Sequence, residues 1–380
     1  MNFVLAVLSR DAAGLLLAAL AALLLAPFSI ALALLVGVVL ALLSLRHIAR
    51  RAEVRRRFPA PGRLVDLGGY RVHVLAEGEA IEGRPAVLWF AGGHASGYAI
   101  HHLHRGFRSR TRSILIDRPG TGWSDAGPFP RSTAGEAEEV IRVLELSGER
   151  GPFVIAGHSF GGLLAANIAR RRPDLTHTLV LLDPTPLDTI IFGPPLQALR
   201  EFRLAPYKAG IARLFGYDLM KRQAELQKQV PAYATVLEAV ERELGPKIVA
   251  ARAVDDRAAA DFAQASIYSE LTPTGAARVA WDTAVYDGDL DGVTVWLVAP
   301  KDDSDVAGLP EAQTDDARLN QRVMRVIARS RERYLATSDR SRRIIAPAGS
   351  GHNFVYEIPD FVIDVMREAI EGPKTTETPP

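Results

Sequence analysis

Ser159 lies in a sequence pattern that suits a nucleophile. It stands within residues 157–161 (G-H-S-F-G), after the apolar run 153–156 (F-V-I-A), which predicts a buried strand. Residues 163–172 then have the composition of a helix that ends at Pro173. Glycines on both sides of the serine permit the sharp strand-to-helix turn called a nucleophile elbow. The first N–H groups of the helix can stabilise negative charge beside the serine.

A serine nucleophile needs a general base, and His352 is the best candidate. The strand predicted at residues 343–346 (R-I-I-A) leads into the loop 347–352 (P-A-G-S-G-H), so this histidine follows a strand end. His158 occupies the variable position of the elbow, and His47 belongs to a basic segment near the N-terminus. Of these histidines, His352 has the loop position and the chain order that a catalytic base requires.

The acid that would orient His352 has several candidates. The strand predicted at residues 293–299 (V-T-V-W-L-V-A) ends in a loop that carries Asp302, Asp303 and Asp305. Asp183 also follows a strand. A carboxylate at the end of a neighbouring strand can hold the imidazole in the required tautomer, so the residue pattern alone leaves these alternatives open.

Several further motifs resemble those of the α/β-hydrolases. They are a first hairpin at 65–74 (V-D-L-G-G-Y-R-V-H-V), a strand at 87–93 (V-L-W-F-A-G-G), a D-x-x-G-x-G-x-S turn at 117–124, and a histidine loop at 351–359. The resemblance runs from about residue 63 to about residue 370, apart from a central insertion. It implies an α/β fold with a mostly parallel central sheet flanked by helices, and a helical cap in the insertion.

The resemblance also implies an order among the candidate acids. Residues 299–306 are similar to the family's G-x-x-D-x-x-V turn, with Pro300 in place of the glycine. This alignment favours Asp303, with Asp302 second. Asp183 is the third possibility, because some relatives carry the acid at that strand end.

The oxyanion hole is implied by the same resemblance. Members of the family usually have His-Gly after the third strand, whereas residues 91–94 of this chain are A-G-G-H. We therefore expect the backbone N–H groups of Gly93 and of Phe160, the residue after the nucleophile, to hold the oxyanion. His94 is a candidate substrate contact.

Residues 12–45 carry no charged side chain and predict a membrane anchor. As one helix the segment would measure about 50 Å, against a hydrocarbon core of about 30 Å. Pro27 lies within it, which leaves a helical hairpin or one kinked, tilted helix, with the hairpin favoured. The arginines that follow predict a cytoplasmic catalytic domain on a bacterial inner membrane, with membrane lipids as partners. They are Arg46, Arg50, Arg51, Arg55, Arg56 and Arg57.

The amino-acid composition excludes several kinds of chemistry and of binding partner. The chain has 380 residues, 48% of them hydrophobic, and no cysteine, which excludes disulfides, thiolate catalysis and cysteine-ligated zinc. The net charge is only +1. Because the excess positive charge adjoins the anchor, we expect no nucleic-acid partner. His101, His102 and His104 form an H-H-x-H pattern without a nearby acid in sequence, so no metal is expected. No cofactor is expected either.

These observations predict five segments and one activity. The segments are an anchor with its basic residues (1–57), a first core part (58–185), a helical cap (186–286), a second core part (287–371) and a disordered tail (372–380).

We expect a serine hydrolase that cleaves carboxylic esters, including lipid-like esters, through an acyl-enzyme. Ser159 in place of an aspartate excludes the dehalogenase and epoxide hydrolase branch. The alternatives are an amidase, a peptidase or an acyltransferase on the same triad, or a non-catalytic binding protein.

Overall fold

An eight-stranded sheet forms the centre of the molecule, with the strand order β1-β2-β4-β3-β5-β6-β7-β8. Strands β1 and β4 each pair antiparallel with β2, and all other neighbours are parallel. The strands are β1 Arg63–Asp66, β2 Arg71–Glu77, β3 Ala86–Phe90, β4 Ser113–Ile116, β5 Phe153–His158, β6 Thr176–Leu182, β7 Thr294–Ala299 and β8 Arg340–Ile345. The computed structural model describes residues 2–93, 95–129, 131–186, 196–215, 262–263, 267, 282–300 and 329–372.

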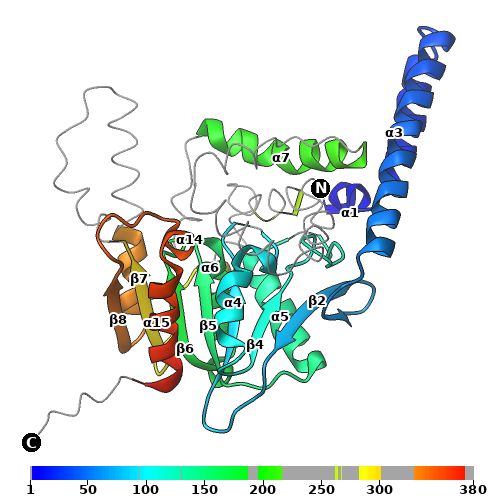
Figure 1. Ribbon diagram of the computed structural model, residues 1–380. Helices are drawn as coiled ribbons and strands as arrows, with labels where there is room; N and C mark the ends of the chain where they lie inside the picture. Colours follow the sequence, from blue (N-terminus) through cyan, green and yellow to red (C-terminus); the bar gives the residue numbers. More distant parts are fainter. Residues whose placement is uncertain are drawn as a thin grey trace, which may run out of the picture.

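Helices cover both faces of this sheet (Figure 1). The helices α5 (Thr133–Ser147) and α6 (Phe160–Arg171) pack on one face, where Ile155 and Leu179 point toward them. On the other face, α4 (His101–Phe107) and α15 (Pro359–Glu371) pack against Val154 and its neighbours. Because successive strand residues point to opposite faces, the apolar run of β5 is buried on both sides. The expected α/β-hydrolase arrangement is therefore confirmed.

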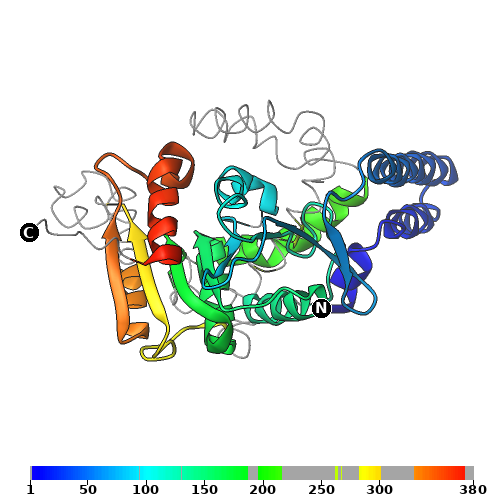
Figure 2. The ribbon, with the colours of Figure 1, turned by 60° about the horizontal axis from the view of Figure 1, so that its bottom comes forward.

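The apolar N-terminal segment is a hairpin of two helices, α2 (Ala13–Leu25) and α3 (Ile30–Arg57), which projects from the sheet domain (Figures 1 and 2). A Cβ added at Gly14 would lie 2.3 Å from Ser44 Oγ, and one at Gly37 would lie 2.8 Å from Ala22 Cβ. Gly14 near the start of α2 meets Ser44, whereas Ala22 further along α2 meets the earlier residue Gly37 of α3. The two helices are therefore antiparallel. Small residues let helices approach closely in an apolar environment. Of the two anchor arrangements expected from the sequence, the structure has the hairpin.

A short helix, α1 (Asn2–Leu8), precedes the hairpin and packs against α7 (Leu196–Leu214). The contact buries Leu5, Leu8 and Leu214. The helix α7 belongs to the insertion that we expected to form a cap. Most of the predicted cap (186–286) and nearly all of the predicted tail (372–380) lie outside the described residues.

Candidate active site

Ser159 sits at the sharp turn between β5 and α6, with φ 52° and ψ −122°. This backbone conformation is strained for a residue with a side chain and is typical of a nucleophile elbow. The glycines of the motif make the turn possible. A Cβ on Gly157 would lie 2.3 Å from Gly161 O, and one on Gly161 would lie 2.5 Å from Phe90 O. The expected strand–turn–helix context of the serine is present.

His352 follows β8 and reaches Ser159, as the sequence analysis expected. The Ser159 hydroxyl and His352 Nε2 lie 3.0 Å apart, a hydrogen-bond distance at which the hydroxyl can donate to the imidazole. The side chain of His352 is about half exposed, whereas His158 and Leu182, at the ends of β5 and β6, are buried. The serine and the half-exposed base are therefore in contact at the carboxyl ends of the strands.

Among the described residues, the carboxylate that contacts His352 is Asp183, and the preference for Asp303 stays a prediction. His352 Nδ1 lies 2.5 Å from Asp183 Oδ2, and the aspartate is fully buried. Its backbone has φ 45°, and its N–H donates to Val298 O at 2.7 Å. Asp302 and Asp303 lie outside the described residues. The orienting contact thus comes from the candidate that the sequence ranked third.

The strand order explains why Asp183 can reach this position. Strand β6 is the direct neighbour of β5, and His158 pairs with Leu182 in their register. The next residues on the two strands, Ser159 and Asp183, therefore emerge side by side at the same sheet edge. A further hydrogen bond joins the segment after β6 to the elbow, because the Thr185 N–H donates to Ser159 O at 2.8 Å.

Arg331 is a member of the site that sequence reasoning missed. Its Nη1 lies 2.6 Å from Asp183 Oδ1, and its Nε donates to Pro184 O at 3.2 Å. Oδ1 receives no aligned hydrogen bond from the described residues, so the attraction is chiefly that of an ion pair. Both side chains are buried. Arg331 lies far along the chain from Asp183 and outside the motifs named above.

His158 has a positioning role that its variable place in the elbow did not reveal. Its Nε2 lies 2.9 Å from His352 O, so the N–H can hold the loop that carries the base. The two imidazole rings lie 5.0 Å apart. Burial, together with the nearby His352, lowers the pKa of His158 to about 4. The residue is therefore neutral at physiological pH and keeps one N–H for this contact.

The proposed oxyanion loop lies beside the serine. A Cβ on Gly92 would lie 3.1 Å from Ser159 Cβ, and Gly93 has a φ of +56°, which glycine adopts readily. The Phe160 N–H belongs to the first turn of α6. Arg118 joins these two positions, because its guanidinium donates to Gly93 O and lies 5.7 Å from the Phe160 ring centroid. His94 lies outside the described residues.

The histidine cluster on α4 has a structural explanation. His104 lies between Ser113 Oγ, 2.8 Å from its Nδ1, and Glu77 Oε2, 2.9 Å from its Nε2. His102 instead contacts Val355 O at 2.9 Å. Potential ligand atoms of Glu77, His101 and His104 lie within 4.8 Å of one another. Because Glu77 also pairs with Arg108, its charge is balanced by the protein itself.

Comparison with known proteins agrees with the fold. Residues 83–365 match the alpha/beta hydrolase family, and the chain belongs to that family. It is 29% identical over 138 residues to mouse epoxide hydrolase 4 and 27% identical over 133 residues to an uncharacterized vacuolar membrane protein of Saccharomyces cerevisiae. These matches cover 35% and 30% of this chain, but only 38% and 20% of the two relatives. A probable hydrolytic enzyme from Pseudomonas aeruginosa has a similar structure, with TM-score 0.52 and 18% identity over 82% of this chain and 95% of that one.

Proposed function

We propose that this protein is a membrane-anchored serine hydrolase that cleaves carboxylic esters through an acyl-enzyme. The single observation that carries the proposal is the connected series Ser159–His352–Asp183, with contacts of 3.0 and 2.5 Å. A hydroxyl, an imidazole and a buried carboxylate in this order constitute the machinery of nucleophilic acyl transfer.

In this proposal Ser159 Oγ attacks the ester carbonyl while His352 Nε2 accepts the hydroxyl proton. Asp183 stabilises the imidazolium and holds its tautomer. The N–H groups of Gly93 and Phe160 bind the oxyanion, and Arg118 fixes their relative position. His352 then returns the proton to the departing alkoxide, and a water molecule activated by the same imidazole hydrolyses the acyl-enzyme.

The residue at the nucleophile elbow distinguishes the proposed ester hydrolysis from epoxide hydrolysis, the reaction in the name of one relative. An epoxide hydrolase of this family would carry an aspartate nucleophile, as the family resemblance implies, whereas this chain has Ser159. Amidase, peptidase and acyltransferase activities remain alternatives, because they use the same three residues. A non-catalytic binding protein is the other alternative, although the strained φ of Ser159 favours a reactive site.

Covalent labelling with a fluorophosphonate probe tests the proposal. The full-length protein should react, and Ser159→Ala should abolish both labelling and the hydrolysis of short esters, by about 10³-fold or more. Ser350→Ala, which removes a hydroxyl from the histidine loop, is the matched control and should still label. Labelling that persists in Ser159→Ala would overturn the assignment of the nucleophile.

The hairpin supports membrane attachment. Helix α3 is long and apolar enough to cross a membrane by length and composition. The arm α2, however, has 13 residues and measures about 20 Å, less than a hydrocarbon core of about 30 Å. Phe28 at the tip is 86% exposed, and residues 26–29 carry no charge. We therefore propose that the hairpin enters the bilayer from one side and that its tip stays in the hydrocarbon.

The same geometry leads to a proposal on location and substrate. Both ends of the hairpin adjoin arginines, which favours the cytoplasmic side of a bacterial inner membrane for the sheet domain. Esters that partition into the bilayer would concentrate near this domain. A truncated protein that begins at Phe58 should hydrolyse a short soluble ester, yet lose activity toward long-chain esters in vesicles relative to the full chain. Equal activity of both proteins on vesicles would contradict the role of the anchor in substrate access.

A further inference from the structure

The turn after β4, residues 117–125, contacts both the end of the hairpin and the proposed oxyanion loop. On the hairpin side, Trp123 Nε1 donates to Phe58 O at 3.0 Å, and Phe58 is the residue at which α3 ends. The indole is buried, and Val54 and Tyr98 pack against it. The turn therefore holds the end of the second hairpin arm by a hydrogen bond as well as by apolar contact.

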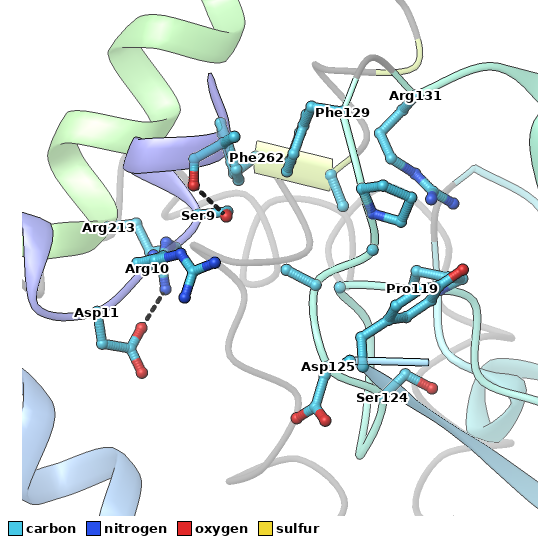
Figure 3. Close-up of a pocket in the computed structure, with 18 of the residues that line it drawn as sticks. Ser9, Arg10, Asp11, Pro119, Ser124, Asp125, Phe129, Arg131, Arg213 and Phe262 are labelled. Carbon is cyan, nitrogen blue, oxygen red and sulfur yellow. Dashed lines mark hydrogen bonds and ion pairs between the residues drawn. The ribbon is translucent and has the colours of Figure 1, made fainter. Parts of the chain in front are cut away.

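A pocket of about 840 Å³ at the base of the hairpin separates this turn from the N-terminal segment. Ser124 and Asp125 of the turn line one side of the pocket, and Arg10 and Asp11 line the other (Figure 3). Arg55 of α3 does reach the turn, since its Nη2 lies 3.2 Å from Asp125 Oδ1. These contacts join the turn to the second arm of the hairpin.

The linker after α3 reaches the same turn through His73. The Gly62 N–H donates to His73 Nε2 at 3.1 Å, so Nδ1 carries the ring proton and donates to Asp117 Oδ2 at 2.8 Å. His73 and Asp117 are both buried. A Cβ on Gly62 would lie 2.0 Å from Val74 O, so the linker can approach this closely only with a glycine here.

The carboxylate of Asp117 joins the hairpin side of the turn to the oxyanion loop. Its Oδ2 accepts the hydrogen bond of His73 and a second one from the Trp123 N–H at 3.1 Å. Its Oδ1 accepts a hydrogen bond from the Gly97 N–H at 2.9 Å. A buried carboxylate that accepts three hydrogen bonds is held in one position.

Two consecutive residues of the turn hold the oxyanion loop at two points. Asp117 accepts from the Gly97 N–H, and the guanidinium of Arg118 donates to Gly93 O. Gly93 is one of the two expected oxyanion donors, and Gly97 follows four residues later. A Cβ on Gly97 would lie 3.0 Å from Leu115 Cβ, so the chain packs closely on β4 at this point. A displacement of Asp117 would therefore move the loop that carries the Gly93 N–H.

We propose that Asp117 is a positioning residue for the oxyanion loop, and that the end of the hairpin holds Asp117 in place through Trp123 and His73. The proposal rests on the serine chemistry proposed above. The donors of an oxyanion hole act most strongly when charge develops on the substrate oxygen, so a small displacement of the loop weakens the transition state most. Substrate binding depends less on these donors, so kcat should respond more than KM.

An aryl trifluoromethyl ketone reports on the oxyanion hole directly. Ser159 Oγ adds to its carbonyl carbon, His352 takes the hydroxyl proton, and the carbonyl oxygen becomes an oxyanion. Its inhibition constant and the turnover of a short ester are measured on the full-length chain in detergent micelles.

Trp123→Phe keeps an aromatic ring but removes the N–H that donates to Phe58 O. Since one hydrogen bond corresponds to about fivefold, we expect kcat to fall about fivefold and the inhibition constant to rise by the same factor. KM should change little. The acidic limb of the pH profile should not move, because the contacts of His352 with Ser159 and Asp183 are unchanged.

Trp296→Phe is the matched control, because both indoles are 7% exposed and Trp296 lies in β7, outside this turn. It should change kcat and the inhibition constant less than twofold. Asp117→Asn should change both by about 30-fold, since hydrogen bonds to a charged group contribute more than neutral ones. If Trp123 acts through Asp117, the double variant should be no worse than Asp117→Asn alone.

The outcomes separate this proposal from the serine chemistry. A full-length protein that neither hydrolyses esters nor binds the ketone would refute both. Inhibition of the unmodified protein with an equal constant in Trp123→Phe would refute the positioning role alone. Equal losses in Trp123→Phe and Trp296→Phe would show a general loss of stability and would also overturn it. Trp123→Phe decides the matter even where Asp117→Asn does not fold.

Discussion

Arg331 and His352 share the carboxylate of Asp183, one on each oxygen. Arg331 Nη1 lies 2.6 Å from Oδ1, and His352 Nδ1 lies 2.5 Å from Oδ2. The acid of the candidate triad is therefore neutralised in part by a buried arginine. This contact holds the carboxylate in place, and it also weakens the field that Asp183 exerts on the imidazole.

Replacing Arg331 should disturb the placement of the general base. In Arg331→Met, Asp183 loses the guanidinium that lies 2.6 Å from its Oδ1, so the carboxylate is held less firmly against His352. We expect kcat to fall by about tenfold with little change in KM, because a contact to a charged group contributes about 1.5 kcal/mol. Arg331→Lys should retain most of the activity, and the exposed Arg329→Met is the control. An unchanged kcat in a folded Arg331→Met protein would show that the ion pair does not act on the site.

Substitution of the candidate acids tests which of them orients His352. Asp183→Asn should reduce kcat by about 10³- to 10⁴-fold, because the amide cannot stabilise the imidazolium. Asp303→Asn and Asp302→Asn should stay within a fewfold of the unmodified protein. All three are compared by turnover of a short ester at one pH. A severe loss in Asp303→Asn or Asp302→Asn with a mild loss in Asp183→Asn would return the role to the loop after β7.

His158→Phe should weaken the placement of the base without removing it. Phenylalanine keeps an aromatic ring at this buried position but lacks the N–H that contacts His352 O. We expect kcat and the rate of fluorophosphonate labelling to fall together, by about fivefold, since one hydrogen bond contributes about 1 kcal/mol. KM should change little. An unaltered labelling rate would mean that the loop is held by other contacts.

Glu77 should contribute to stability in a defined pH range. The hydrogen bond from His104 lowers its pKa from 4.5 to about 2, with Arg108 adding to this effect against the burial. A carboxyl group whose pKa is lower in the folded state stabilises the protein above about pH 4.5, and this contribution disappears as the pH falls toward 2.

Glu77→Gln therefore should lower the thermal unfolding midpoint above pH 4.5, with the difference shrinking toward pH 2. The measurement is made in detergent micelles across this range. Glu79→Gln, at an exposed position two residues away, should show no such pH-dependent difference. A constant difference at all pH values would point to altered packing and not to the charge.

Local sequence determined the parts of the site that depend on backbone geometry. Gly157 and Gly161 are required because a Cβ at either position would collide with backbone atoms, so the elbow is visible as a pattern of glycines around Ser159. The continuous apolar run of β5 likewise follows from a strand buried on both faces. The histidine loop and the apolar anchor were visible for the same reason, since each is a feature of a short continuous segment.

Tertiary structure alone decided which distant side chains meet. Asp183 and the loop after β7 both follow strands that end at the same side of the sheet, so their position after a strand could not rank them, and the family resemblance favoured Asp303. The register of β6 against β5 brings Asp183 beside Ser159. The ion pair with Arg331 and the pocket at the base of the hairpin join residues that are far apart in the chain. Such contacts depend on how the elements pack in space, and no local propensity encodes that packing.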